Sequence, residues 1–215
     1  MDQISIIGGG LAGSEAAWQA ANLGIRVILY EMRPYVLTGA HKTDKLGELI
    51  CSNSLGSNLP DRATGQLLYE LKQLNSLLIQ IADQTCVPAG GALAVDRELF
   101  SSLVTRKLES HPNIQIIREE VKSIPDGICV IASGPLTSPA MMDSISNFVG
   151  DDSLFFFDAI APIISKESID MSIAFRASRY ERGVDADGDY INCPFNETEY
   201  DHFIQELTDA ERIEL

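Results

Sequence analysis

The sequence has few of the residues that build disulfide frameworks or zinc sites. Its four cysteines, Cys51, Cys86, Cys129 and Cys193, include no Cys-x-x-Cys pair, and there are only three histidines. We therefore expect no metal site, and free thiols in a reducing compartment. Cys129 lies in the apolar run 128–132, where we expect a buried thiol without a reactive role.

Long apolar runs and positive charges are also scarce. No stretch approaches the roughly 18 apolar residues that a membrane span needs. A strand expected from Ile4 leaves no room for a secretory signal, so we expect a cytoplasmic protein without membrane contact. The 31 acidic residues outnumber the 16 basic ones and give a formal net charge of −15. This balance argues against strong nucleic-acid binding by this segment alone, because phosphate contacts need a basic surface.

The most informative motif is a glycine turn that directly follows the first apolar strand. The run Gly8-Gly9-Gly10-Leu11-Ala12-Gly13 has the G-x-G-x-x-G spacing of dinucleotide-binding proteins. Gly8 permits the tight turn, Gly10 lets the backbone approach the phosphates, and Gly13 lets the next helix lie close to the sheet. A pyrophosphate would then lie at the positive end of that helix.

The residues around this turn support a dinucleotide site over a turn that binds nothing. Residues 11–23 place small and apolar side chains at helical spacing, and Gly24 ends that helix. A strand over 26–30 leads to Glu31, about where an acid would bond the ribose hydroxyls. The order of strand, glycine turn, helix, strand and acid predicts a Rossmann-like α/β fold.

A second apolar strand, 128–132, ends in the turn Ser133-Gly134-Pro135. This arrangement is typical of two-nucleotide flavoproteins, in which the chain returns beside the first dinucleotide, and it favours FAD over NAD as the tightly held cofactor. The residues that we expect to hold the cofactor are Gly8, Gly9, Gly10, Leu11, Ala12, Gly13, Glu31, Arg33 and Gly134.

Further elements can be predicted from periodicity and capping signals. We expect a long functional loop over 32–62, strands at 114–118, near Val121 and at 154–157, and helices over 64–75, 97–110 and 138–149. The stripe formed by Leu67, Leu68, Leu71 and Leu74 is expected in the core. Asp96 and Asn196 are expected as helix N-caps, and Glu199, three residues after Asn196, matches the spacing of a capping box. The predicted domains are an FAD-binding domain over 1–158, incomplete because its return segment is missing, and the start of a smaller α+β domain over 159–215.

Several long strings resemble one family. They are GGGLAGSEAAWQAANLGIRVILYEMRP (8–34), TDKLGELICSNSLGSN (43–58), VPAGGALAVDR (87–97) and VIASGPLTS (130–138). These strings are similar to the folate- and FAD-dependent tRNA uracil-5-methyltransferases, and the resemblance covers nearly the whole chain.

The resemblance implies a glutathione-reductase-like FAD fold and a defined reaction. Methylenetetrahydrofolate would supply a methylene group to C5 of the T-loop uridine of tRNA, reduced FAD would supply a hydride, and NADH or NADPH would regenerate the flavin. The expected partners are therefore tRNA and folate. Family members are roughly twice as long, so we expect a fragment or half of a split gene product, with uncertain activity alone. The alternative is a stand-alone FAD- or NAD-binding module without an RNA substrate.

Cys51 is the candidate catalytic residue. Uracil C5 becomes nucleophilic once a nucleophile adds to C6, and a thiolate both attacks and leaves well. By resemblance, Cys51 matches one of two functional cysteines of the family, and its role as nucleophile, acid-base partner or protector of a flavin adduct stays open. His41 and Lys42 are candidates for folate or phosphate contacts, or else solvated loop residues. Arg97 is a candidate for the pyrophosphate or flavin, or else a surface ion pair, and Cys193 is expected to be structural.

Overall fold

The computed structural model describes residues 3–150, 164–178 and 188–211. The chain divides into two compact units, one formed by residues 1–87 and 91–162 and the other by residues 88–90 and 163–215. The domain boundary expected after residue 158 stays a prediction. Among the described helices, none is long and apolar enough to cross a membrane.

The first unit contains a parallel sheet of four strands, β1 (Gln3–Ile7), β2 (Arg26–Glu31), β6 (Ile114–Arg118) and β7 (Cys129–Ile131). Their order is β6-β2-β1-β7, and every neighbouring pair is parallel. The chain thus moves outward from β1 to β6 and then returns to the other side of β1. This reversal confirms the Rossmann-like α/β fold and creates a switch point between the carboxyl ends of β1 and β7, where ligands of such sheets bind.

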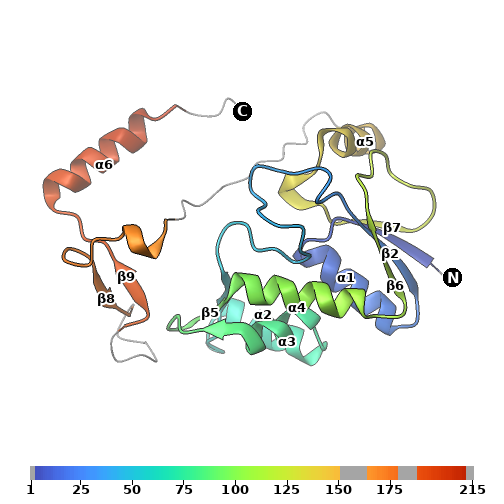
Figure 1. The fold of residues 1–215 in the computed structure, drawn as a ribbon, viewed down its shortest axis with the longest axis horizontal. Helices are drawn as coiled ribbons and strands as arrows, with labels where there is room; N and C mark the ends of the chain where they lie inside the picture. Colours follow the sequence, from blue (N-terminus) through green and yellow to red (C-terminus); the bar gives the residue numbers. More distant parts are fainter. Residues whose placement is uncertain (1–2, 151–163, 179–187, 212–215) are drawn as a thin grey trace. The chain divides into compact units, whose positions relative to one another are not determined.

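Helices α1 (Leu11–Asn22), α3 (Leu77–Thr85) and α4 (Arg97–Glu109) pack together beside the sheet (Figure 1). They bury apolar side chains that recur at helical spacing, and α4 alone contributes three fully buried ones. Asp96 caps α4, since its carboxylate accepts a hydrogen bond from the Leu99 amide at 2.9 Å. The core includes Ile6, Ala17, Val27, Leu29, Leu46, Leu77, Ile81, Phe100, Val104 and Leu108.

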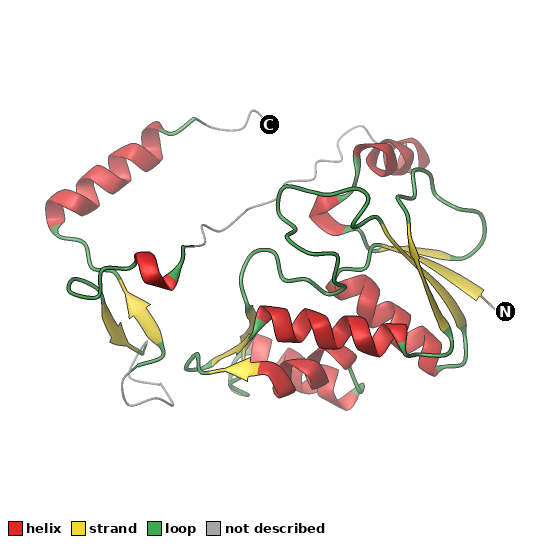
Figure 2. Ribbon diagram, viewed as in Figure 1, coloured by secondary structure: helices red, strands yellow, loops and turns green. Residues whose placement is uncertain are grey.

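A small antiparallel sheet extends the first unit. It consists of β3 (Ser54–Ser57), β5 (Ala92–Val95) and β4 (Cys86–Val87), in that order. These strands and α3 were not predicted. Figure 2 shows the stretch between β2 and β3 as loop. The loop expected over 32–62 is therefore shorter than predicted, because β3 lies within that range.

Two predictions about this unit are wrong. Helix α2 (Ala63–Gln73) forms, but Leu67 and Leu74 of its expected core stripe are 54% and 67% exposed, because α2 buries only a narrow face around Leu68. The strand expected near Val121 is also absent from the described segment 119–128, which follows β6 as a loop. Helix α5 (Pro139–Val149), which follows the short 3-10 helix Gly134–Leu136, matches its prediction.

The second unit has a 3-10 turn (Lys166–Ser168), the antiparallel pair β8 (Phe175–Ala177) and β9 (Tyr190–Asn192), and helix α6 (Glu197–Asp209). The expected capping box is confirmed: Asn196 accepts from the Glu199 amide, and Glu199 accepts from the Asn196 amide, both at 2.9 Å. The strand expected over 154–157 lies outside the described residues.

Candidate functional site

A cavity of about 540 Å³ opens at the carboxyl ends of β1, β2 and β7. Its walls come from segments far apart in the sequence: the glycine turn, the end of β2, the loop around Cys51, residues 119–121 and the turn around Gly134. The volume falls within the range of small-molecule and cofactor sites, roughly 300 to 1,000 Å³. The cavity lies at the switch point of the sheet, where the fold predicts a ligand.

The glycine turn brings the start of α1 to this cavity. Gly8 adopts a φ of +99°, and its amide donates to the Tyr30 carbonyl at 2.9 Å. A Cβ on Gly13 would lie 1.8 Å from the Gly8 oxygen, whereas a Cβ on Gly10 would meet no described atom within 4 Å. Gly10, Leu11 and Ala12 line the cavity and carry no acidic side chain. The first amides of α1 are therefore open to an anion.

The carboxylate of Glu31 stabilises the glycine turn by binding the Gly9 amide. It is buried and accepts hydrogen bonds from the Gly9 amide at 2.9 Å and from the amide, Nε and Nη2 of Arg33 at 2.9–3.0 Å. Burial raises the pKa of Glu31, but the hydrogen bonds and charge of Arg33, together with the Gly9 amide, outweigh it and leave the pKa below its ordinary value of 4.5. Glu31 is thus ionised at neutral pH.

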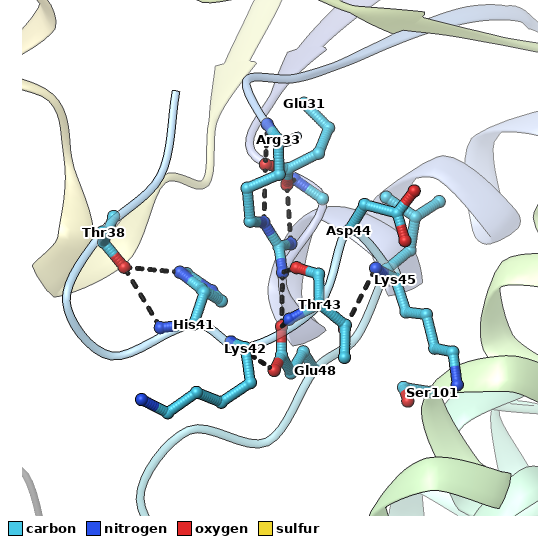
Figure 3. Close-up of polar contacts among 12 residues, drawn as sticks. Glu31, Arg33, Thr38, His41, Lys42, Thr43, Asp44, Lys45, Glu48 and Ser101 are labelled. Atoms are coloured by element: carbon cyan, nitrogen blue, oxygen red, sulfur yellow. Dashed lines mark hydrogen bonds and ion pairs between the residues drawn. The ribbon is translucent and has the colours of Figure 1, made fainter. Parts of the chain in front are cut away.

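Arg33 links the end of β2 to the following loop (Figure 3). Its side chain is only 1% exposed and bridges two acids, with Nε 2.9 Å from Glu31 and Nη1 2.7 Å from Glu48. Glu48 also accepts from the Lys42 amide at 2.9 Å and the Thr43 amide at 3.3 Å. Two carboxylates around one guanidinium satisfy a charge that would be costly to bury alone.

The loop that carries Cys51 is attached at several points. The Gly47 amide donates to the Gly9 carbonyl at 2.8 Å, so the loop contacts the glycine turn directly. The Leu46 amide donates to Thr105 Oγ1 of α4 at 2.8 Å, and Nη2 of Arg97 donates to the Cys51 carbonyl at 2.9 Å. Cys51 itself is exposed and belongs to the cavity wall.

The structure brings most of the predicted site residues together. The cavity is lined by Gly8, Gly10, Leu11, Ala12, Glu31, Arg33, Gly134 and Cys51. Gly9 and Gly13 instead shape the turn, through the Glu31 bond and the close approach to Gly8.

Other sequence-based candidates lie elsewhere or have different contacts. Arg97 Nη2 donates to the Cys51 carbonyl, a contact that neither alternative named, and the expected contact of Arg97 with the pyrophosphate or flavin stays a prediction. His41 lines the cavity, and its Nδ1 lies 2.8 Å from Thr38 Oγ1. Lys42 is exposed. Cys129 is only half-buried because β7 forms an edge of the sheet, and Cys193 is exposed.

Sequence reasoning missed part of the wall. Glu119, Glu120 and Val121 line the cavity directly after β6, and Met141 reaches it from α5. The first three could have been found, because the carboxyl ends of neighbouring parallel strands meet at the same edge of a sheet. Met141 and Glu48 carry no such signal, since only the fold brings them to the site.

Comparisons with known proteins show which family and which relatives the chain is similar to. The family model described as Glucose inhibited division protein A matches residues 3–215. A protein of Moorella thermoacetica named methylenetetrahydrofolate--tRNA-(uracil-5-)-methyltransferase TrmFO is 56% identical over 212 residues, covering 98% of this chain and 48% of that protein. The protein of the same name from Aquifex aeolicus is 55% identical over 213 residues, covering 99% and 47%.

Among solved structures, GidA of Aquifex aeolicus is similar at 22% identity and a TM-score of 0.48, over 58% of this chain and 20% of that one. The chain spans about half the length of the curated relatives that it matches.

Proposed function

This chain belongs to the Glucose inhibited division protein A family, and from this premise we propose that it supplies the FAD-binding half of a tRNA methyltransferase. The reaction would be folate-dependent methylation of C5 of the T-loop uridine. More than half of the residues are identical to those of proteins whose name states a methylenetetrahydrofolate-dependent tRNA (uracil-5-)-methyltransferase, and the T-loop position comes from the family resemblance. The observation that carries the proposal is that Cys51 lies on the wall of the same cavity as the dinucleotide turn.

The residues of the cavity fit FAD. The open amides at the start of α1 suit its pyrophosphate, and the absence of a Cβ on Gly10 leaves room for it among the described atoms. When bound, FAD would supply the hydride that converts the transferred methylene into a methyl group. Glu31 and Arg33 would orient the ribose end, with Glu31 keeping its bond to the Gly9 amide and thereby holding the turn in shape.

Cys51 would provide the sulfur chemistry at this site. In one role its thiolate would add to C6 of uracil, and C5 would then bond the methylene carbon of methylenetetrahydrofolate. Loss of the C5 proton to a base would release tetrahydrofolate, and addition of a hydride to the methylene carbon would expel the thiolate from C6. Its position on the cavity wall also suits an acid-base or protecting role beside the flavin. In each case the thiol must face the cofactor, which its exposure allows.

Partners follow from the same proposal. Methylenetetrahydrofolate is the carbon donor, tRNA is the acceptor, and NADH or NADPH reduces the flavin. We propose that the other half of the protein supplies most of the tRNA contacts, because this chain carries a net charge of −15.

The test joins this chain to the C-terminal half of the Moorella relative and compares Cys51→Ala with the unchanged protein. We expect uridine methylation, measured with labelled methylenetetrahydrofolate, to fall at least about 100-fold, while the visible flavin absorbance stays. Cys86→Ala is the matched control, since Cys86 is also an exposed cysteine but does not belong to the described cavity wall.

Two outcomes would contradict the proposal. Full methylation by Cys51→Ala would remove Cys51 from the reaction. A protein that binds FAD but transfers no methyl group in either form would support the alternative of a flavin-binding module without an RNA substrate.

A further inference from the structure

We infer that Arg97 is a positioning residue for Cys51. This inference rests on the proposed function, in which Cys51 must face the bound cofactor. The direct observation is the hydrogen bond of 2.9 Å from Arg97 Nη2 to the Cys51 carbonyl. A bond to the backbone fixes the direction in which the loop presents its side chain without occupying the thiol.

The polar face of α4 consists of Arg97, Ser101 and Thr105, which recur every four residues and so lie on one side of the helix. Ser101 Oγ donates to the Arg97 carbonyl at 2.9 Å, and Thr105 Oγ1 donates to the Ser101 carbonyl at 2.8 Å. Thr105 Oγ1 also accepts from the Leu46 amide. Two positions of one rigid helix therefore hold two positions of the loop.

The loop is fixed on both sides of Cys51 as well. Upstream, the amides of Leu46 and Gly47 are bound, by Thr105 and by the Gly9 carbonyl. Downstream, Asn53 exchanges two hydrogen bonds of 2.9 Å with Val95, at the end of β5. Loss of the Arg97 bond should therefore release only the middle of the segment and leave the fold intact.

The location of Arg97 on its helix supports the same conclusion. It is the first residue of α4, where the helix dipole disfavours a cation. Its charge thus contributes nothing favourable to the helix itself, whereas Glu98 and the Asp96 cap do. The structural benefit of an arginine at this position lies in its reach to the Cys51 loop.

The first measurement does not depend on any cofactor. With carbonyl-13C cysteine incorporated into the chain, we expect Arg97→Met to shift the Cys51 signal and to leave the signals of Cys86 and Cys193 in place. Arg97→Lys, which keeps a donor, should restore much of the shift. The control is Arg106→Met, an exposed arginine of the same helix. Arg97→Gln serves as a second variant if circular dichroism shows that Arg97→Met is unfolded.

The second measurement reads the orientation of the thiol. Bound FAD should slow the alkylation of Cys51 by iodoacetamide, followed by peptide mass spectrometry, and Arg97→Met should lose most of this protection at unchanged FAD affinity. In the joined full-length protein, the same variant should lower kcat roughly 10- to 100-fold with little change in the KM for tRNA, since misplacement of a reacting group costs this much.

The outcomes separate this inference from the proposed function. An unmoved Cys51 signal or undiminished protection in Arg97→Met would overturn the role of Arg97. If the chain without substitutions binds no FAD, the proposed cofactor site is overturned instead. The 13C signal of the Cys51 carbonyl would still decide whether Arg97 holds Cys51.

Discussion

At the scale of single residues, two glycines of the same motif have separable roles. Gly13 is packed against the Gly8 oxygen, whereas the space around Gly10 is open toward the cavity. The first is a requirement of the fold, and the second is a requirement of the ligand. The motif predicts both positions and these two roles, and the structure adds the contact with the Gly8 oxygen on which the role of Gly13 depends.

Alanine substitutions should separate these roles. We expect Gly13→Ala to lower the free energy of unfolding by roughly 1–3 kcal/mol or more, because its Cβ would lie 1.8 Å from a backbone oxygen. Gly10→Ala should unfold like the original chain but bind FAD at least about tenfold more weakly, since a methyl group would separate the phosphates from the amides. Gly39→Ala, which meets no described atom within 4 Å, is the control. Equal FAD affinity in Gly10→Ala would contradict the assignment of the cavity.

Glu31 should make the stability of the first unit depend on pH. Its pKa in the folded chain lies below 4.5 because of Arg33 and the Gly9 amide, so its stabilising contribution is complete above that value and is lost as the pH falls through the lower folded pKa. We expect Glu31→Gln to cost roughly 3 kcal/mol at about pH 7, as for a broken buried ion pair.

The measurement is urea unfolding of both proteins between about pH 7 and about pH 3. The difference in unfolding free energy should stay constant down to the ordinary pKa of 4.5 and narrow below it. Asp126→Asn, which changes an exposed acid of the loop 119–128, should show no such difference. If the difference in unfolding free energy between the original protein and Glu31→Gln stays constant to the lowest pH, the Glu31 pKa is not lowered.

At the scale of elements, the sequence predicts what is specified locally. The bounds of β1, α1, β2, β6 and α4 agree with expectation to within a few residues, because glycine turns, caps and apolar periodicity lie inside the elements themselves. The strands β3, β4 and β5 were missed because each is four residues or shorter and exists through pairing with distant segments. The exposure of Leu67 and Leu74 likewise depends on which neighbours α2 meets.

In the candidate site, too, locally specified features were predictable and long-range contacts were not. Its glycine turn, terminal acid and thiol were predictable, since each has a motif or a chemical signature. The contacts that hold the thiol were not, because Arg97 and Thr105 reach the Cys51 loop across 46 and 59 residues of sequence. Glu48 completes the set around Arg33 for the same reason, 15 residues away along the chain. Rigid elements thus carry the positioning, and loops carry the chemistry.

At the scale of the whole molecule, charge decides what this half can bind. A dinucleotide needs only the amides of one helix start, whereas tRNA binding depends on many cationic contacts to phosphate. With 31 acidic and 16 basic residues, this chain repels a polyanion overall. The cofactor and the RNA are therefore expected to depend on different halves of the full-length protein.

Gel-shift measurements on the 215-residue chain and on the joined protein can test whether the cofactor and the RNA depend on different halves. At about 0.15 M salt, we expect the 215-residue chain to leave tRNA unshifted, and the chain joined to the C-terminal half of the Moorella relative to shift it. The affinity of the joined protein should fall steeply as salt is raised, because binding releases counterions from the phosphates. Retained FAD binding by the shorter chain would show that it is folded. Equally strong, salt-dependent tRNA binding by the 215-residue chain would instead place the basic contacts on this half, in a local patch that outweighs its net charge.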